Sequence, residues 1–206
     1  SQVALPLLGV VQLGQWYPLV LVPLAVVSVS NATNMLAGIN GIEAGMAAVM
    51  LTAIGAFLLQ HNSIEGAVIA FCAAAALLAF LKFNWIPAKM FPGDSLTYFA
   101  GAAIVSAIVI GNAEKLGILL FIPWIIEAFL KLRGRFKVRS YGDLQKDGTL
   151  KAPYEKIYSL THVAMKLPYW LGLKKGFTEK QVACLLIGSQ IILSIGVLAF
   201  YNLVSY

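Results

Sequence analysis

The sequence predicts an all-α protein: a polytopic membrane helix bundle of six or seven spans, with a small β-hairpin and an amphipathic helix on the cytoplasmic side. Hydrophobic residues make up 60% of the 206 residues and charged residues only 12%, and the mean hydropathy is +0.82. A soluble domain is nearer to about half apolar and a quarter charged. We therefore treat residues 1–206 as a single membrane domain, in which 133–181 form a cytoplasmic loop.

The apolar residues fall into separate runs of the length that a transmembrane helix needs, about 20 residues. The expected spans are 17–30, 46–60, 66–82, 96–111, 116–132 and 182–204. Residues 3–12 are apolar but short, so they form either the tail of a span or an interfacial segment. Cys72 and Cys184 lie inside apolar runs, which predicts small packing residues and neither a disulfide nor a zinc site.

The distribution of Lys and Arg predicts the orientation in the membrane. Alternation of the spans puts the short connections near 61–65 and 112–115 on one side and all longer connections on the other. With the adjoining helix ends, the longer connections carry 14 of the 15 Lys and Arg residues, and only Lys115 lies on the other side. The positive-inside rule assigns the basic side to the cytoplasm. The net charge of +6 is thus explained mainly by the orientation of the protein in the membrane and does not require nucleic acid as a partner.

The longest connection, 133–181, has the features of a folded segment. Asp147–Gly148 is a signal for a hairpin turn, and 153–166 has the pattern of an amphipathic helix lying on the membrane surface. Four basic residues alternate with other residues at its start, and in an extended chain they would point to one side. Such a row suits anionic lipid headgroups or the phosphate oxygens of a substrate. The four residues are Arg133, Arg135, Lys137 and Arg139.

Polar residues gather in "NATNMLAGINGIEAG" at 31–45, directly after the first expected span. Asn31 and Asn34 are three residues apart and share a face if the helix continues. Gly38 and Gly41 suit a helix end and a close backbone approach. A simple cap and turn explains the stretch about as well as a binding role does. The other polar side chains of the stretch include Asn40 and Glu43.

A second polar stretch, "MFPGDSLTYFAG" at 90–101, precedes the fourth expected span. Asp94 is placed to act as an N-cap, which alone would explain it. Alternatively, a carboxylate near amide carbonyls suits Mg²⁺, which takes one or two protein ligands and completes its shell with water and substrate phosphates. Phe91 offers either a stacking face or ordinary interfacial packing.

All of this polar chemistry falls on the basic side of the predicted bundle. A transporter needs polar groups at mid-membrane. The centres of the spans hold little beyond Glu127, which we expect to pair with Lys131 one helical turn later. One-sided chemistry therefore favours an enzyme that works where the bilayer meets the cytosol.

The two polar stretches together resemble a known family. The first is similar to the Asn-x-x-Asn-x-x-x-Gly-x-Asn-Gly-x-Glu signature of the polyprenyl-phosphate N-acetylhexosamine-1-phosphate transferases. Its "LAGINGIEAG" form is most like the eukaryotic and archaeal UDP-GlcNAc–dolichyl-phosphate GlcNAc-1-phosphate transferases, whereas bacterial relatives usually have Asp at the positions of Ala37 and Asn40. "FPGDSLTYFAG" resembles the corresponding later segment of the same branch.

The resemblance implies transfer of GlcNAc-1-phosphate from UDP-GlcNAc to a polyprenyl or dolichyl phosphate with release of UMP, the first step of lipid-linked oligosaccharide synthesis for N-glycosylation. It implies Mg²⁺, with Mn²⁺ as the alternative, held by the catalytic residues Asn34 and Asp94. Asn40 would bond the uracil edge and Phe91 would stack on it. The substrate-binding residues implied are Asn31, Asn40, Glu43, Phe91, Arg135 and Lys137. Phe136 stands where the family's basic motif has His.

Two features depart from the family. The family has an adjacent Asp-Asp pair on an earlier cytoplasmic segment, and no two acidic residues are adjacent here; the family also has more spans. We therefore expect the later part of such an enzyme, completed by an N-terminal segment or another chain, and a homodimer is a further expectation. The alternative is a non-catalytic or degenerate membrane subunit that retains nucleotide binding. The expected location is the cell membrane of an archaeon or the endoplasmic reticulum membrane of a eukaryote.

Overall fold

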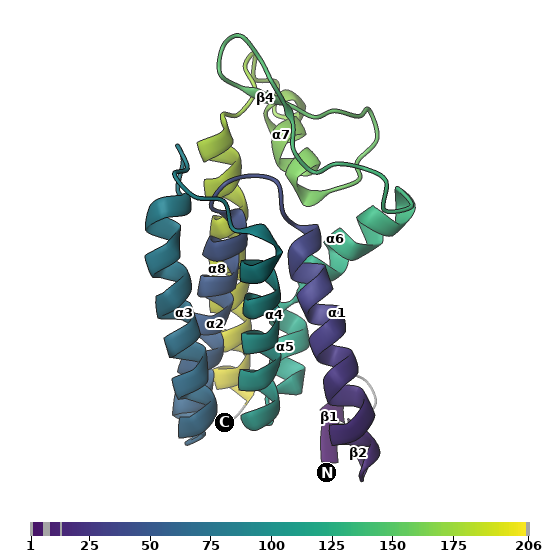
Figure 1. Cartoon of the computed structure of the whole chain (residues 1–206), viewed down its shortest axis with the longest axis vertical. Helices are drawn as coiled ribbons and strands as arrows, with labels where there is room; N and C mark the ends of the chain where they lie inside the picture. Colours follow the sequence, from purple (N-terminus) through teal and green to yellow (C-terminus); the bar gives the residue numbers. More distant parts are fainter. Residues whose placement is uncertain (1, 6–8, 13, 205–206) are drawn as a thin grey trace.

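The structure is a computed structural model that describes residues 2–5, 9–12 and 14–204. Figure 1 shows a bundle of long helices with a smaller lobe of turns and short elements at one end. The bundle consists of η1 (Tyr17–Leu21), a π-helical turn that runs into α1 (Val22–Met35), followed by α2 (Ile42–Gln60), α3 (Ile64–Asn84), α4 (Gly93–Ile110), α5 (Glu114–Leu120), α6 (Ile122–Arg133) and α8 (Glu179–Val204). The lobe contains the strands β3 (Asp143–Leu144) and β4 (Leu150–Lys151) and the helix α7 (Leu160–Trp170). The expected all-α bundle with a small hairpin is confirmed.

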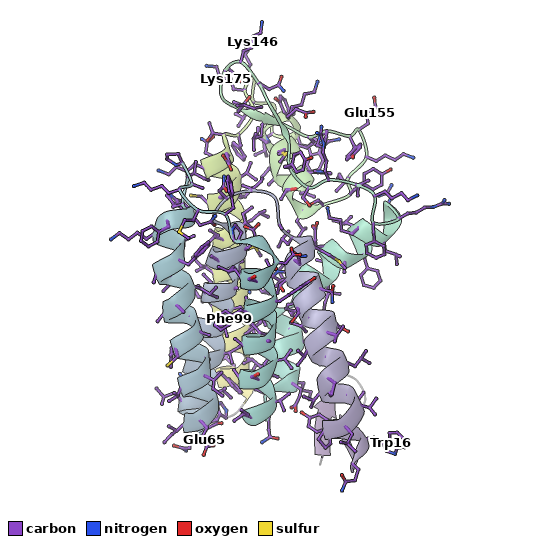
Figure 2. The ribbon with its side chains drawn as sticks, in the orientation of Figure 1. Trp16, Glu65, Phe99, Lys146, Glu155 and Lys175 are labelled. Carbon is purple, nitrogen blue, oxygen red and sulfur yellow. The ribbon has the colours of Figure 1, made fainter. Side chains whose placement is uncertain are left out.

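The connections between helices alternate between the two ends of the bundle (Figure 1). The lobe and the α1–α2 and α3–α4 loops lie at one end, which we call the basic end because 14 of the 15 Lys and Arg residues belong to it. Figure 2 shows Lys146 and Lys175 at this end and Glu65 at the other. Lys115, the remaining basic residue, lies in the first turn of α5 at the end opposite the lobe.

Within the described residues, five helices are long and apolar enough to cross a membrane. They are Tyr17–Met35, Ile42–Gln60, Ile64–Asn84, Gly93–Ile110 and Glu179–Leu203. Their outer faces expose large apolar side chains, for example Leu24 on α1, Phe71 on α3 and Ile192 on α8. Water-soluble proteins rarely expose so much apolar surface, whereas lipid tails are as apolar as these side chains. The chain is a multi-pass membrane protein.

Helix α2 lies at the centre of the bundle, with α3, α4 and α8 packed around it. It is apolar on all sides, as expected of a helix with neighbours all round, and Met50 at its middle is fully buried. Small residues allow close helix contacts, as is common in membranes. A Cβ at Gly45 would lie 2.5 Å from Ile187 on α8, and one at Gly55 would lie 2.9 Å from Phe71 on α3.

Helices α1 and α4 meet backbone against backbone at Gly101. A Cβ added there would lie 2.5 Å from Cα and 2.7 Å from the backbone nitrogen of Ser30 on α1. A larger residue would therefore have to push one helix away. The Ser30 hydroxyl donates a hydrogen bond to the Tyr98 carbonyl (3.3 Å) across the same contact. One turn earlier on α4, towards the basic end, the close packing of the two helices places Thr97 in contact with α1.

The expected span 116–132 is not one continuous helix. It is divided at Phe121 into α5 and α6, and α6 leans away from the bundle towards the lobe (Figure 1). Pro123 explains the break, because proline has no N–H to donate and is tolerated only in the first turn of a helix. Pro123 lies in the first turn of α6.

The predicted hairpin is present in the lobe. Strands β3 and β4 pair antiparallel, with Asp143 opposite Lys151, and Gly148 has a φ of 80° in the turn between them. The surface helix begins later than expected, since 153–159 are not helical and α7 starts after Ser159. The Ser159 hydroxyl accepts from the Thr161 N–H (3.3 Å) and caps the helix.

The described residues of the short apolar segment 3–12 lie in two strands and not in a span. Strands β1 (Gln2–Leu5) and β2 (Gly9–Gln12) pair antiparallel. They lie beside the start of the first helix, at the end opposite the lobe (Figure 1).

The substitution Gly101→Ala tests the contact between α1 and α4. The added methyl group would force the two backbones apart, and overpacking of this kind costs about 1–3 kcal/mol. We expect a lower midpoint of thermal unfolding in detergent. Gly188→Ala on α8 is the matched control, because nothing lies within 4 Å of an added Cβ there and alanine has the higher helix propensity. Equal midpoints for the two variants would contradict the contact.

Candidate active site

Asn34 meets the start of α4 at the basic end. Its Oδ1 accepts a hydrogen bond from the Thr97 hydroxyl (3.2 Å), and the same hydroxyl lies 3.1 Å from the Asp94 carbonyl. Thr33 donates from α1 to the Thr97 carbonyl (2.8 Å). Thr97 therefore joins the last turn of α1 to the first turn of α4. This places the backbone of Asp94 close to Asn34, the residue with which it shares the predicted metal site.

Asp94 has an exposed carboxylate. The N-cap of α4 is Pro92, and Asp94 lies within the first turn, where the helix dipole favours a negative charge. The interpretation of Asp94 as an N-cap is therefore wrong. The described residues make no hydrogen bond or ion pair to this carboxylate, which leaves it available to a ligand. Phe91, just before the helix, is 79% exposed and offers an open ring face.

The α1–α2 loop is held through its own backbone N–H groups. The N–H of Gly38 donates to Oε1 of Glu43 on α2 (3.1 Å), and that of Gly41 donates to Oδ1 of Asn84 on α3 (2.8 Å). Asn84 is fully buried, and its Nδ2 donates to the Met90 carbonyl (2.9 Å). Asn84 thus ties the α1–α2 loop to the α3–α4 loop.

Asn40 is bound to the first turn of α8. Its backbone N–H (3.2 Å) and its side-chain Nδ2 (2.9 Å) both donate to Oε1 of Glu179. Asn40 is half-buried. The amide that the family resemblance assigns to uracil is therefore held in place by a residue 139 positions later in the chain.

The two glycines of the loop are required by its conformation. Gly38 has a φ of 123°, and Gly41, the N-cap of α2, has a φ of 85°, values that side chains other than glycine rarely adopt. A Cβ at Gly41 would lie 2.9 Å from the ring of Trp85, and one at Gly38 would lie 3.4 Å from the Tyr141 nitrogen. The predicted helix end is confirmed, because α1 ends at Met35, before Gly38, and α2 begins after Gly41. The close approach to the loop backbone is made by residues of the protein, Trp85 at Gly41 and Tyr141 at Gly38.

Asn31 and Glu43 lie at the margin of this arrangement. Asn31 is exposed, and its Nδ2 donates to the Val27 carbonyl of its own helix (2.7 Å). Glu43 is only 8% exposed. One oxygen accepts from Gly38, whereas Oε2 is buried and has no hydrogen-bond partner among the described residues. In this structure Glu43 acts as a support for the loop.

The basic segment after α6 is not extended, so the expected one-sided row is wrong. Helix α6 continues through Arg133, and the next residues form a turn in which Arg135 and Phe136 have φ values of 52° and 56°. The turn breaks the alternation on which the expectation depended. Arg135 and Lys137 are exposed, and among the described residues no hydrogen bond or ion pair holds their side chains.

The side chains of the first and last basic residues of that set, Arg133 and Arg139, contact nearby residues of the lobe. The guanidinium of Arg133 lies over the Tyr158 ring, 5.8 Å from its centroid. Arg139 pairs with Asp143, with 2.6 Å between Nη2 and Oδ1. These contacts leave Arg135 and Lys137 as the residues of the set that remain open to a phosphate.

A buried ion pair joins the lobe to the bundle. Nζ of Lys131 lies 3.7 Å from Oε1 of Glu127 one turn earlier on α6, as expected. Oε2 of Glu127 accepts from the Leu160 N–H at the start of α7 (2.7 Å). Lys131 donates to the Val138 carbonyl (3.2 Å) and to the Ser140 hydroxyl (2.5 Å). Both charges are buried, which is tolerated because each has further hydrogen-bond partners.

His162 extends this buried network on α7, and no pattern in the sequence pointed to it. Its Nε2 donates to the Arg139 carbonyl (3.0 Å) and its Nδ1 accepts from the Tyr158 N–H (3.3 Å). Only the neutral ring with its proton on Nε2 satisfies both contacts. Burial is the main cause that lowers the pKa of His162 to about 4, and the nearby charge of Lys131 acts in the same direction.

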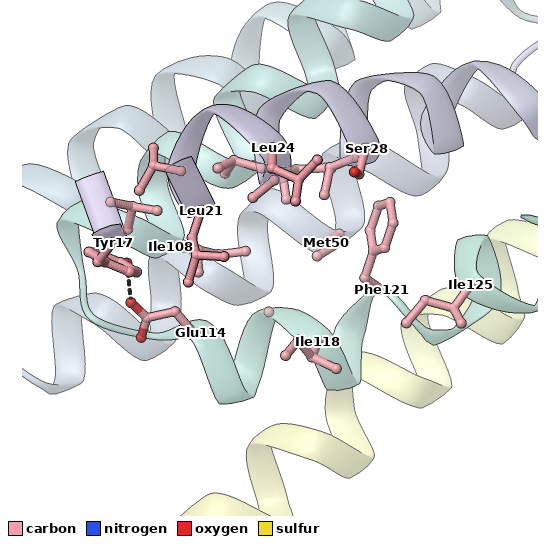
Figure 3. A pocket seen from close by; sticks show the side chains of 17 residues that line it. Tyr17, Leu21, Leu24, Ser28, Met50, Ile108, Glu114, Ile118, Phe121 and Ile125 are labelled. Atoms are coloured by element: carbon pink, nitrogen blue, oxygen red, sulfur yellow. Dashed lines mark hydrogen bonds between the residues drawn. The ribbon is translucent and has the colours of Figure 1, made fainter. Parts of the chain in front are cut away.

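A cavity of about 390 Å³ lies between α1, α4 and α5 (Figure 3). Its lining is apolar apart from Tyr17, Ser28 and Glu114. The Tyr17 hydroxyl donates to Glu114 Oε1 (2.5 Å) at the end far from the lobe. None of the predicted site residues lines the cavity. It suits a hydrocarbon chain and lacks the polar groups that a nucleotide requires.

The polar groups near Asp94 fit a particular kind of metal site. Among the described residues, no three His, Cys, Asp or Glu side chains are grouped to hold a metal ion. Mg²⁺ needs only one or two protein ligands and takes the rest from water and phosphates. The exposed carboxylate of Asp94, with the amide oxygen of Asn34 near its helix, matches that requirement.

The fold and the site define a class: a membrane helix bundle whose polar, metal-compatible groups gather at one end. Comparison with known families matches residues 1–112 to the model described as glycosyl transferase family 4. The chain belongs to glycosyl transferase family 4.

Similar proteins come from archaea and bacteria. A Saccharolobus solfataricus protein, provisionally named UDP-N-acetylglucosamine–dolichyl-phosphate N-acetylglucosaminephosphotransferase, is 38% identical over 197 residues, covering 95% of this chain and 59% of that protein. A Sulfolobus acidocaldarius protein with the same provisional name is 32% identical over 200 residues, covering 96% and 58%. The phospho-N-acetylmuramoyl-pentapeptide-transferase of Listeria innocua is 29% identical over 112 residues, covering 54% and 35%. The chain thus spans less than two thirds of the length of these relatives.

The structure adds three residues to the predicted site. Thr97 follows Asp94 by one helical turn, a spacing that could have suggested its contact with the same partner. Asn84 is a polar residue at the end of an apolar span, which is a weak signal of a buried hydrogen-bonding role. Nothing in the sequence links Glu179 with Asn40.

Acid should loosen the lobe, because protonation of His162 removes the acceptor at Nδ1. The folded pKa, about 4, lies below the unfolded value of about 6.5. The stabilising contribution is therefore complete above pH 6.5 and is lost as the pH falls towards 4. Between pH 7 and pH 5 the free energy of unfolding should decrease by about 2 kcal/mol from this group.

Denaturant unfolding in detergent at pH 7 and pH 5 measures this decrease. His162→Gln should be less stable at pH 7 but should lose less stability on acidification, because glutamine does not titrate. His61→Gln, at the exposed end of α2, is the matched control and should retain the full pH dependence. An unchanged pH dependence in His162→Gln would show that another group is responsible.

Proposed function

We propose that the protein, in its full-length form, transfers N-acetylglucosamine-1-phosphate from UDP-N-acetylglucosamine to a polyprenyl or dolichyl phosphate and releases UMP. The observation that carries the proposal is the junction of α1 and α4 at the basic end, where Thr97 holds Asn34 beside the turn that bears the free carboxylate of Asp94. Membership of glycosyl transferase family 4 and the names of the archaeal relatives support the same activity.

Phosphoryl transfer needs charge neutralisation and alignment more than covalent work by the protein. Asp94 and Asn34 would hold Mg²⁺, with Mn²⁺ as the alternative; the bound ion supplies Lewis-acid stabilisation of the charge on the pyrophosphate. The exposed side chains of Arg135 and Lys137, which have no hydrogen-bond or ion-pair partner in the described part of the chain, are suited to bind phosphate oxygens of the nucleotide or the lipid. The open ring of Phe91 is suited to stack on the base.

The position of the site suits two substrates of different solubility. The basic end is the cytoplasmic end by the positive-inside rule, so a soluble nucleotide sugar reaches it from the cytosol. The lipid phosphate arrives laterally, with its chain in the hydrocarbon layer. In an archaeon this membrane is the cell membrane, and in a eukaryote it is that of the endoplasmic reticulum. An N-terminal segment or a second subunit would complete the site.

The proposal predicts that the purified full-length protein forms UMP and lipid-linked N-acetylglucosamine from UDP-N-acetylglucosamine and polyprenyl phosphate. Activity should require Mg²⁺ and disappear with a chelator. Asp94→Asn should lower kcat by about 100-fold or more, because loss of a metal ligand removes several kcal/mol of transition-state stabilisation.

Glu155→Gln is the matched control, because it also neutralises an exposed acid at the basic end (Figure 2) but lies outside the proposed site. It should retain the rate of the unmodified enzyme. Full activity of Asp94→Asn would disprove the metal assignment. Nucleotide binding without turnover by the full-length protein would instead support a non-catalytic subunit.

A further inference from the structure

The amide of Asn40 is held in one orientation by Glu179. A single carboxylate oxygen, Oε1, accepts from both the backbone N–H (3.2 Å) and the side-chain Nδ2 (2.9 Å) of Asn40. Two bonds to one acceptor restrict the side-chain torsions of Asn40 as well as its backbone. This contact joins the α1–α2 loop to the first turn of α8.

The chemistry of the contact decides which end of the amide remains free. An ionised carboxylate only accepts hydrogen bonds, so the NH₂ group of Asn40 must face it. The other end, Oδ1, then points away from Glu179, and no described residue donates a hydrogen bond to it. Asn40 therefore presents Oδ1 as a hydrogen-bond acceptor, while its NH₂ group faces Glu179 and one of the two N–H donors is bonded there.

The support beneath this acceptor is rigid. The neighbouring N–H groups of Gly38 and Gly41 are bonded to Glu43 and Asn84, which belong to two other helices. The loop thus has anchors on α2, α3 and α8. Rotation of the Asn40 amide would break the bond to Glu179 and place its carbonyl oxygen against a carboxylate, which is repulsive.

We infer that Glu179 is a positioning residue that makes Asn40 selective for a nucleobase with a ring N–H donor. The inference rests on the proposed function, because it takes the nucleotide to bind at this loop. Uracil carries such a donor at N3, whereas N3 of cytosine is an acceptor and would oppose Oδ1 of Asn40. A site built to bond one polar group rejects an analogue that leaves the site's own group unpaired.

Calorimetry with UDP and with CDP on the full-length protein in detergent tests this inference. The unmodified protein should bind UDP at least about tenfold more tightly than CDP, the effect of about one hydrogen bond. Glu179→Ala frees the amide to rotate, so the ratio should fall towards one, mainly through weaker UDP binding. Glu179→Asp should do the same while keeping the charge, because its shorter side chain withdraws the acceptor.

Glu179→Gln supplies the rescue, because its amide oxygen can accept the same two bonds and should preserve most of the ratio. Glu65→Ala is the matched control: it removes an acid from the first turn of another helix, α3, at the opposite end of the bundle. Its ratio should equal that of the unmodified protein. An unchanged ratio in both Glu179→Ala and Glu179→Asp would overturn the role of Glu179.

The outcomes also separate this inference from the proposed function. Tight UDP binding with no preference over CDP would overturn the selectivity while leaving the transferase proposal intact. No binding of either nucleotide by the full-length protein would overturn both. If Glu179→Ala does not fold, Glu179→Asp compared with Glu179→Gln decides the question, and equal ratios in those two variants would overturn the inference.

Discussion

The close approach of α1 and α4 at Gly101 is the constraint on which the candidate site depends. Because Gly101 has no side chain, the α4 backbone lies against Ser30, and one turn nearer the basic end Thr97 reaches both Thr33 and Asn34. The hydrogen bonds at that point have definite geometry only while the helices remain this close. A membrane offers no hydrophobic force to press helices together, so tight packing at small residues has to supply the contact.

The α1–α2 loop shows how a flexible sequence becomes a defined surface. Asparagine and glycine lose much conformational entropy when they are ordered. Three side-chain acceptors on three helices offset that loss by bonding the N–H groups of Gly38, Asn40 and Gly41. One consequence is that these amides do not form a phosphate cradle. Recognition by this loop must instead use side-chain groups such as Oδ1 of Asn40.

The lobe depends on a different interaction, the buried pair of Glu127 and Lys131. Each charge would be costly to bury alone, and both hold segments of the lobe. Lys131 bonds Val138 and Ser140 shortly after α6, and Glu127 bonds the start of α7. Removal of one partner would leave an unpaired charge in the interior. The exposed Arg135 and Lys137 lie between these anchored points, so the segment that carries them has a defined path over the basic end.

The sequence alone determined the helical membrane class, most of the span positions, the hairpin turn at Asp147–Gly148 and the polar stretches around Asn34 and Asp94. These are local or periodic features, set by hydropathy, turn preference and spacing within one element. Only the tertiary structure decided that α6 departs from α5, that the basic segment turns instead of extending, and that Asn40 faces Glu179. The pairing of Asn40 with Glu179 spans 139 residues, and no local preference encodes it. It exists because the packing of α2 against α8 places the end of the α1–α2 loop beside the first turn of α8. There the carboxylate of Glu179 accepts hydrogen bonds from Asn40.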